Sequence, residues 1–229
     1  MNNRPHTKAI LAMTADGKIA DHLKSPARFG SDNDKLHLQQ QVALADGVMF
    51  GANTLRAYGT TMSVFNPELL LERQKRSQLP QPVQIVVSAS AKLDLNWRFF
   101  QQPVPRWLIT TAENVKLWQE KPEFERILTT KPAGQDNLVI DWLSIFVQLK
   151  ELGLHQLAIL GGGELIASLL SANLIDELWL TICPIIFGGI DAPSPVAGKG
   201  LTQLEGKRLK LLQVKRLEQE IFLNYQIQN

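Results

Sequence analysis

The chain contains a single cysteine, Cys183, among its 229 residues. One cysteine cannot form an internal disulfide, and alone it cannot supply a thiolate metal site. Because Cys183 lies in an apolar run at residues 178–187, we expect it to be a small buried hydrophobic residue. The four histidines lack metal-ligand spacing, and no Gly-x-Ser-x-Gly motif is present, so neither a metal site nor a serine-hydrolase site is predicted.

The chain also lacks a large excess of charge and a long apolar run. Lys and Arg number 24 and Asp and Glu number 22, which leaves a formal net charge of +2 and no electrostatic case for a nucleic-acid partner. No uncharged apolar stretch reaches the length of a membrane span, and residues 1–8 lack the apolar segment of a signal peptide. We therefore expect a cytoplasmic protein without a membrane or nucleic-acid partner.

Short apolar runs alternate with helical segments along most of the chain. Strands are predicted at residues 8–13, 47–50, 83–87, 106–111, 126–130, 156–160 and 175–182, and helices at 32–45, 66–77, 112–119, 141–153 and 164–172. Ser31 is the expected N-cap of the first helix. An antiparallel pair is predicted at residues 207–215 and 220–226. This order indicates one α/β domain over residues 1–229, with a mostly parallel sheet and an antiparallel C-terminal edge.

Three adjacent glycines, Gly161, Gly162 and Gly163, separate a predicted strand from a predicted helix. Without side chains, their amides can approach a ligand closely, and a helix N-terminus favours an anion. The pyrophosphate of a dinucleotide is the natural occupant, with Glu164 and Leu165 in the first turn. The spaced Gly-x-G-x-x-G fingerprint is absent from this loop, and a tight turn without a ligand is the alternative.

A second turn, Gly51 to Thr54, follows another predicted strand. Thr54 could cap a helix and bind a phosphate, and Arg56 could pair with a 2′-phosphate. A capped helix with a solvated arginine is the alternative. Ser88 ends a buried strand and could contact ribose or phosphate, or could be a loop-entry serine. Asp16 lies at a turn after the first strand, where aspartate is usually structural.

Four stretches, in order, resemble the reductase family typified by the C-terminal domain of the bifunctional riboflavin deaminase-reductase. They are MTADGKIA at residues 13–20, ADGVMFGANT at 45–54, LGGGEL at 160–165, and LIDEL at 174–178 followed by PIIFGG at 184–189. The resemblance covers about residues 8–226. It implies a dihydrofolate-reductase-like three-layer fold, NADPH as hydride donor and a homodimer.

The resemblance also implies cofactor contacts for particular residues of this chain. These positions are Met13, Arg28, Thr54, Tyr58, Ala89 and the loop at residues 162–168. Gly51, Arg56, Ser88 and Gly161 are added from their local chemistry. On the substrate side the chain departs from the family. Val42 stands where the family has an arginine, and Leu160 stands where it has a glutamate, so the phosphorylated pyrimidine substrate is in question.

The leading hypothesis is an NADPH-dependent reductase of the 5-amino-6-(5-phosphoribosylamino)uracil reductase type in riboflavin biosynthesis, which transfers hydride to the ribosyl-derived carbon. Asp16 is the candidate catalytic group, through a proton-donating water. One alternative is a reductase of another pterin, heterocyclic or carbonyl substrate. The other is a catalytically silent nucleotide-binding homologue, which the departures at Val42 and Leu160 motivate.

Overall fold

The structure is a computed structural model that describes residues 3–130 and 140–228. The chain divides into two compact units, and each draws on two separate stretches. The first unit comprises Met1–Pro5 and Val42–Leu157, and the second comprises His6–Gln41 and Ala158–Asn229. That residues 1–229 act as one reductase domain stays a prediction.

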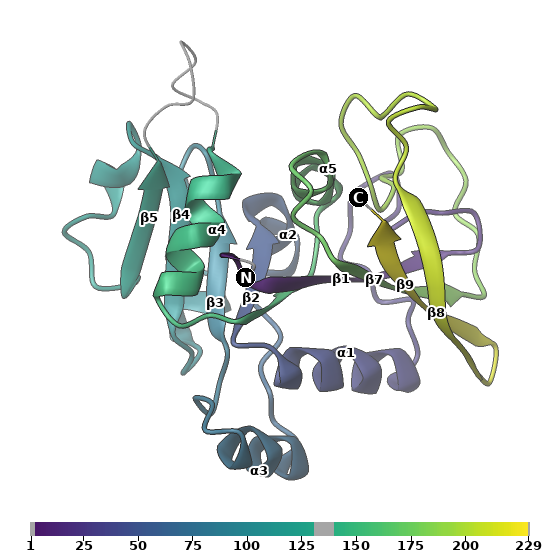
Figure 1. The fold of residues 1–229 in the computed structure, drawn as a ribbon, viewed down its shortest axis with the longest axis horizontal. Coiled ribbons are helices and arrows are strands. Elements are labelled where there is room, and N and C mark those ends of the chain that lie inside the picture. The colour runs from purple at the N-terminus through teal and green to yellow at the C-terminus, as the bar shows by residue number, and fades with distance from the viewer. Residues whose placement is uncertain (1–2, 131–139, 229) are drawn as a thin grey trace. The chain divides into compact units, whose positions relative to one another are not determined.

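The first unit is built on four parallel strands (Figure 1). They are hydrogen-bonded in the order β5 (Arg126–Thr130), β4 (Arg106–Thr111), β3 (Val83–Val87) and β2 (Gly47–Gly51). Its helices are α2 (Ala52–Tyr58), α3 (Pro67–Lys75) and α4 (Trp142–Glu151), with 3₁₀ segments at Arg98–Gln101 and Val115–Leu117. Ile85, Val86, Leu108 and Ile109 are fully buried, as expected for parallel strands covered on both faces.

The second unit combines parallel and antiparallel pairing. β1 (His6–Thr14) runs parallel to β7 (Glu177–Cys183), and β9 (Glu220–Gln228) pairs antiparallel with both β7 and β8 (Arg208–Leu217). Helix α5 (Gly163–Ser171) lies entirely within this unit. Helix α1 (Asp32–Leu44) and strand β6 (Gln156–Ile159) each cross the boundary between the two units in the chain. The predicted mixture of a mostly parallel sheet and an antiparallel C-terminal edge is confirmed.

Ser31 acts as the predicted N-cap of α1. Its hydroxyl oxygen accepts hydrogen bonds from the amides of Asn33 and Asp34 at 3.1 and 3.3 Å. Its own amide and hydroxyl donate to the buried carboxylate of Glu220, at the start of β9, at 2.8 and 2.5 Å. A cap on one element is therefore fixed by a strand almost 200 residues later in the chain, which holds α1 against the sheet of the second unit.

Two predictions about local structure were wrong. Thr54 does not cap a helix, because α2 begins earlier, with Gly51 in the N-cap position and Thr54 inside the first turn. The predicted helix at residues 112–119 is only the 3₁₀ segment Val115–Leu117. In so short a segment, the few helical hydrogen bonds do not offset the unfavourable free energy of helix nucleation. Short connecting segments of this kind commonly form a 3₁₀ turn. Cys183 is fully buried as expected, and burial raises the pKa of its thiol to about 12.

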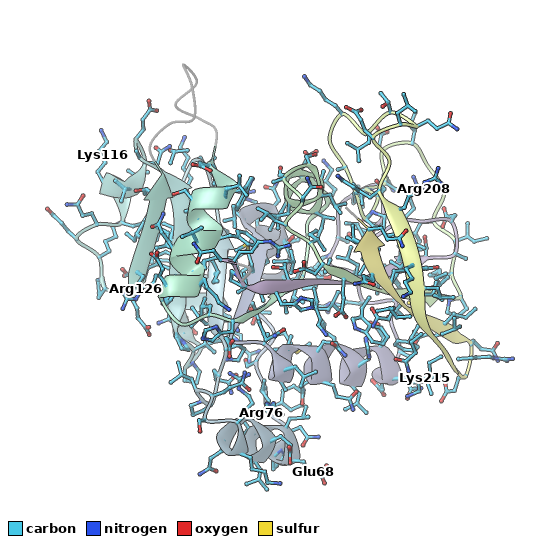
Figure 2. The ribbon with its side chains drawn as sticks, viewed as in Figure 1. Glu68, Arg76, Lys116, Arg126, Arg208 and Lys215 are labelled. Atoms are coloured by element: carbon cyan, nitrogen blue, oxygen red, sulfur yellow. The ribbon has the colours of Figure 1, made fainter. Side chains whose placement is uncertain are left out.

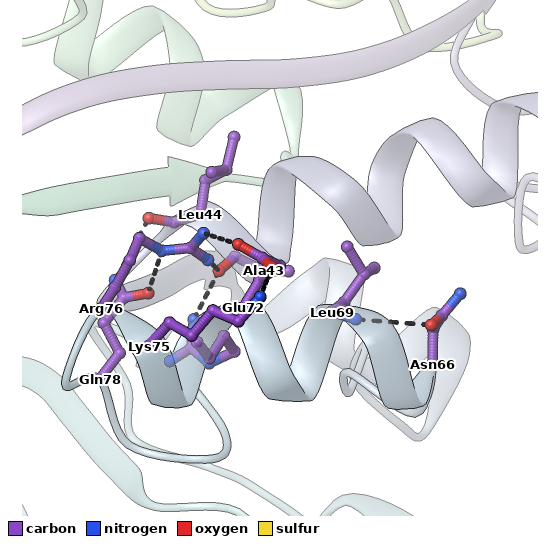
Figure 3. A network of polar contacts seen from close by, with 9 residues as sticks. Ala43, Leu44, Asn66, Leu69, Glu72, Lys75, Arg76 and Gln78 are labelled. Atoms are coloured by element: carbon purple, nitrogen blue, oxygen red, sulfur yellow. Dashed lines mark hydrogen bonds and ion pairs between the residues drawn. The ribbon is translucent and has the colours of Figure 1, made fainter.

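Within the first unit, α3 is anchored to the end of α1 by two arginines. The guanidinium of Arg73, which is almost fully buried, donates to the carbonyls of Ala43, Ala45 and Leu79 at 2.7 to 2.9 Å. Burial lowers the pKa of Arg73 to about 10. Arg76 adds a 2.9 Å bond to the carbonyl of Ala43 (Figure 3). The carbonyls of Ala43 and Ala45 lie at the C-terminal end of α1, where carbonyls lack a partner within the helix, so the arginines satisfy groups that burial would otherwise leave unpaired.

Candidate functional site

The candidate residues of the first unit gather where parallel strands end. Gly51 closes β2, while Ser88 and Ala89 directly follow β3. β2 and β3 are parallel neighbours, with Gly51 opposite Val87 in the register. In open α/β sheets, ligands bind outside the carboxyl ends of the strands, so this edge is where a ligand is expected.

The three candidate site residues on α2 differ in solvent exposure. Thr54 is half-buried in the first turn, whereas Arg56 and Tyr58 are exposed. The guanidinium of Arg56 donates to the side-chain oxygen of Asn53, one turn earlier on the same helix. Arg56 is therefore already oriented at this edge, and its remaining donors are available to an anion.

The segment after β3 is held firmly by its own hydrogen bonds. Ser88 is buried, its amide donates to the carbonyl of Ile109 at 3.0 Å, and its carbonyl accepts from the amide of Ala91 at 3.3 Å. The carbonyl of Ala89 accepts from the side-chain amide of Asn114 at 2.9 Å. A loop fixed in this way presents its exposed groups in one conformation, which suits ligand binding.

A broad, open cavity of about 670 Å³ lies in the same unit. Arg56 lines it, together with residues from the connections that follow β3 and β4. These lining residues include Lys92, Asp94, Trp97, Trp118 and Lys121. None of these five residues was expected at a site from the sequence. Each follows the end of a predicted strand within about ten residues, which is the one signal in the sequence that could have identified them.

In the second unit, the triple-glycine loop meets the N-terminus of α5 as predicted. Gly162 is the N-cap of this helix, and as a glycine it has no side chain that could cap the helix amides. Among the described residues of the second unit, the amides of Gly161, Gly162 and Gly163 donate no hydrogen bond. Gly161 and Gly163 are buried and Gly162 is half-buried, so Gly162 at the helix N-terminus is the member of the loop whose backbone is best placed to meet a phosphate anion.

Gly161 and Gly163 are each favoured over other residues for a different structural reason. Gly161 has a φ of 104°, a conformation that disfavours side chains, and its peptide bond to Gly162 is cis. A Cβ on Gly163 would lie 2.7 Å from the carbonyl oxygen of Ser194, so this glycine is required by packing. Of the two residues that follow, Glu164 is exposed, whereas the Leu165 side chain is buried and leaves only its backbone for a ligand.

Asp16 fastens together two loops of the second unit. Its carboxylate accepts a 2.6 Å bond from the Thr14 hydroxyl and bonds of 3.2 and 2.7 Å from the amides of Phe187 and Gly188. The Thr14 hydrogen bond, followed by those two amides, lowers the pKa of this exposed carboxyl. Asp16 is therefore an ionised hydrogen-bond acceptor near the end of β1.

The remaining candidates are also located. Met13 is half-buried near the end of β1, and Arg28 is exposed in the segment between β1 and α1. Val42 is fully buried in the core, and Leu160 is half-buried immediately after β6. Neither can bind a phosphate through its side chain. Within residues 3–130 and 140–228, no cluster of three metal-ligating side chains occurs, and each helix is too short or too polar to cross a bilayer.

Known proteins of similar sequence support the family resemblance. The model of the RibD C-terminal domain family matches residues 5–223. The 2,5-diamino-6-ribosylamino-4(3H)-pyrimidinone 5′-phosphate reductase of Archaeoglobus fulgidus is 27% identical over 93% of this chain and 94% of its own length.

Two solved structures show the fold. A pyrimidine reductase-like protein from Corynebacterium diphtheriae has a TM-score of 0.79 and 23% identity, covering 99% of this chain and 93% of that one. Dihydrofolate reductase from Enterococcus faecalis, complexed with NADP(H) and RAB-propyl, has a TM-score of 0.54 and 12% identity over 98% and 97%. The predicted dihydrofolate-reductase-like class is confirmed. The match over nearly the whole sequence shows that this chain belongs to the RibD C-terminal domain family.

Proposed function

We propose that this oxidoreductase of the RibD C-terminal domain family uses NADPH to reduce a ribosylaminopyrimidine 5′-phosphate in riboflavin biosynthesis. The observation that carries the proposal is the end-to-end match with a family in which the full-length relative from Archaeoglobus fulgidus is named a reductase of such a compound. Taken separately, the carboxyl-end edge of β2 and β3 in the first unit and the glycine-capped N-terminus of α5 in the second unit each have features that suit part of a nucleotide.

In this proposal, the residues of the chain bind and orient rather than carry out the redox step. When bound, NADPH supplies the hydride that reduces the ribosyl-derived carbon. In the second unit, the amides at residues 161–163 are the proposed contacts for a phosphate group. In the first unit, Arg56, Ser88 and Ala89 are the proposed contacts for the nucleotide. Met13, Arg28, Thr54 and Tyr58 remain proposed contacts from the resemblance.

Asp16 is proposed to position the substrate side of the site. Its carboxylate is engaged by Thr14, Phe187 and Gly188, so it holds the loop at residues 185–188 beside the end of β1. A water held by Asp16 could deliver the proton that accompanies hydride transfer. Because Val42 and Leu160 offer no polar group, the substrate phosphate must be held by other residues of this chain.

The substrate can be narrowed to two related compounds. The Archaeoglobus fulgidus relative is named for a 2,5-diamino pyrimidinone, whereas the substrate predicted from the sequence is the uracil form, 5-amino-6-(5-phosphoribosylamino)uracil. The test is the loss of NADPH absorbance when the purified protein is given each compound separately. Oxidation with at least one of them is expected. NADPH oxidation with a dihydropterin or an aldehyde, and with neither pyrimidine, would contradict the proposal.

We also propose that the protein is a homodimer paired through β8, in the cytoplasm. β8 is the last strand in the order of the sheet, and residues 208–216 are all exposed. Leu209, Leu211, Leu212 and Val214 are between 43 and 56% exposed on this strand. β8 also carries four cations, Arg208, Lys210, Lys215 and Arg216. Its exposed leucines and valine, on an edge strand with backbone groups open to pairing, still offer an association surface, and a second copy provides a self-complementary partner.

A further inference from the structure

Glu220 is a buried acidic residue of the second unit to which the proposed reaction assigns no task. It is 3% exposed at the start of β9, and its two carboxylate oxygens accept hydrogen bonds from the amide and the hydroxyl of Ser31 at 2.8 and 2.5 Å. The thiol of Cys183, at the end of β7, donates to the same carboxylate at 3.5 Å. One side chain thus ties together the N-cap of α1, the end of β7 and the start of β9.

No cation shares this task. Within the part of the chain that the structure describes, no lysine or arginine forms an ion pair with Glu220. The nearby cations of β8, Lys215 and Arg216, have exposed side chains, and Figure 2 labels Lys215. Burial, and then the charge of Glu220, raise the pKa of Asp34 in the first turn of α1, so one close neighbour is a second carboxyl. A buried carboxylate without a cation depends on its hydrogen-bond donors, and Ser31 supplies two of them.

Ser31 ends the segment that connects β1 to α1, and this segment carries two residues that matter for the site. Arg28, a proposed cofactor contact, is exposed three residues before Ser31. Phe29 packs edge-to-face on Phe187, with the ring centres 5.4 Å apart and an interplanar angle of 87°. Residues 28–31 are therefore fixed at one end by the carboxylate of Glu220 and in the middle by the ring of Phe187.

The two fixed points lie at the carboxyl ends of β1 and β7. Phe187 is itself held, because its amide donates to the carboxylate of Asp16 at 3.2 Å. Thr14 and Cys183, the last residues of β1 and β7, lie opposite each other in the register of these parallel strands. Ligands bind outside the carboxyl ends of such strands, so the segment that carries Arg28 borders an edge where a ligand is expected.

We propose that Glu220 is a positioning residue for cofactor binding, which holds residues 28–30 in one conformation through Ser31 and so presents the Arg28 guanidinium to an anionic group of NADPH. This inference rests on the proposed function and deepens it, since it gives a buried residue the task of ordering an exposed contact. A segment that is ordered before binding loses less conformational entropy when the ligand arrives. Loss of Glu220 should therefore weaken cofactor affinity although Arg28 is still present.

Glu220→Gln in the full chain tests this proposal. Glutamine keeps the shape of the side chain but has one acceptor oxygen in place of two, so Ser31 loses one of its two acceptors. The Kd for NADPH, measured by quenching of tryptophan fluorescence, should rise roughly three- to thirtyfold, the range expected when a charge-assisted contact is lost in part. In turnover assays, kcat at saturating NADPH should stay within about twofold of the wild type. Hydrogen exchange should become faster at the amides of residues 29–31 and change little in the strands.

A double-mutant cycle with Arg28→Ala separates positioning from general destabilisation. If Glu220 acts through the segment that carries Arg28, Glu220→Gln should change the Kd by less than about twofold once Arg28 is absent, because the two substitutions then remove one shared contact. A residue with a purely structural role would lower the melting temperature and give the same loss of affinity in both backgrounds.

Two further variants complete the experiment. Glu218→Gln is the matched control, because Glu218 is an exposed carboxyl in the same turn between β8 and β9, and this variant should bind NADPH like the wild type. Ser31→Gly tests the same contact from the other side and covers the case in which Glu220→Gln does not fold. It removes the hydroxyl that donates to Glu220 while glycine remains an acceptable N-cap, so it should also weaken NADPH binding and speed exchange at residues 29–30.

Two results would overturn the proposal. One is an unchanged Kd for NADPH in both Glu220→Gln and Ser31→Gly, and the other is an equal loss from Glu220→Gln with and without Arg28. Failure of the proposed function looks different. A wild type that neither binds NADPH nor oxidises it with either pyrimidine would reject both proposals together. A wild type that does both, while the variants bind NADPH equally well, would reject only the role of Glu220.

Discussion

The carboxylate of Asp16 accepts a 2.7 Å hydrogen bond from the amide of Gly188, although 172 residues separate the two in sequence. This bond, with its neighbour from Phe187, ties the turn after β1 to the loop after β7. The two strands are parallel neighbours with Thr14 opposite Cys183, so both loops leave the same edge of the second unit. Asp16 therefore controls the order of a loop at the end of the sheet where ligands are expected.

Replacement of Asp16 by alanine should free that loop. We expect faster hydrogen exchange at the amides of Phe187 and Gly188, measured by NMR, with little change in the β-sheet amides. The lowered pKa of Asp16 gives the sign of the pH effect, because the ionised form makes these bonds. Their protection should be present at neutral pH and lost as the pH falls through the pKa of the folded state. Unchanged exchange in Asp16→Ala would show that the loop is held by other contacts.

Gly163→Ala should destabilise the second unit through a clash. The new Cβ would lie 2.7 Å from the carbonyl oxygen of Ser194 and 3.0 Å from the Cβ of Ala197, and backbone cannot move aside cheaply. Overpacking of this kind costs about 1–3 kcal/mol, which thermal denaturation would detect. Gly206→Ala is the control, since its Cβ would meet no atom closer than 3.5 Å. Equal melting temperatures for the two variants would argue against the clash.

Arg73→Met should lower the free energy of unfolding by roughly 2–4 kcal/mol, because buried carbonyls at the end of α1 lose charged donors. Arg76→Met removes one bond to a helix-end carbonyl, together with a 3.0 Å bond to Gln78 and a 3.9 Å ion pair with Glu72, all from a more exposed side chain, and should cost about 1 kcal/mol or less. Urea denaturation of both variants provides the measurement. A smaller loss for Arg73 than for Arg76 would contradict the view that burial sets the value of these bonds.

Asp34 should make stability depend on pH in the direction opposite to most carboxyls. Burial, and then the nearby Glu220, raise its pKa, while a hydrogen bond with Thr181 and the charge of Lys35 act against this. Its contribution is therefore fully present below the ordinary pKa of an aspartate and is lost as the pH rises through the raised pKa of the folded state. Asp34→Asn should raise the melting temperature more at pH 8 than at pH 4.

The matched control for that pH dependence is Asp32, two residues earlier in the same helical turn. Asp32 is exposed and pairs with Lys35 at 2.8 Å, and this pairing lowers its pKa. Asp32→Asn should therefore give a small loss of stability at neutral pH and none at strongly acidic pH. If both variants respond to pH alike, the environment assigned to Asp34 is wrong.

The proposed pairing through β8 predicts that a charge on this strand breaks the homodimer. Val214→Lys places a cation on the exposed edge, and light scattering after size exclusion should then report a monomer. Leu204→Lys is the control, because Leu204 is 99% exposed and lies outside β8. A wild type that is monomeric at all concentrations would reject the dimer.

The strands and helices could largely be predicted because their signals are local. The apolar β-branched run of β3, the caps Ser31 and Asp141, and the glycine after α4 each specify structure within a few residues. α2 was misplaced because Thr54 is a strong cap in isolation, whereas the preceding strand already ends at Gly51 and lets the helix begin there.

The candidate site could be predicted only in part, because local sequence signals place only some of its residues. Gly51 ends a strand, Ser88 directly follows one, and Gly161 comes two residues after one, so their position at the ends of strands could be predicted from the sequence. Lys92 and Lys121 reach their cavity through loops whose paths are set by distant contacts, such as the indole of Trp118 on the carbonyl of Ala91. The burial of Arg73 likewise depends on where two helices end, which no pattern within α3 indicates.

The cavity of the first unit takes its three cations, Arg56, Lys92 and Lys121, from separate connections, and this has a consequence for how such an enzyme can change. Each cation sits on a connection that can be replaced without altering the hydrogen-bonded ladder of β2, β3 and β4. The charge of this cavity can therefore change, or be engineered, one loop at a time, while the strands that carry the loops keep their sequence.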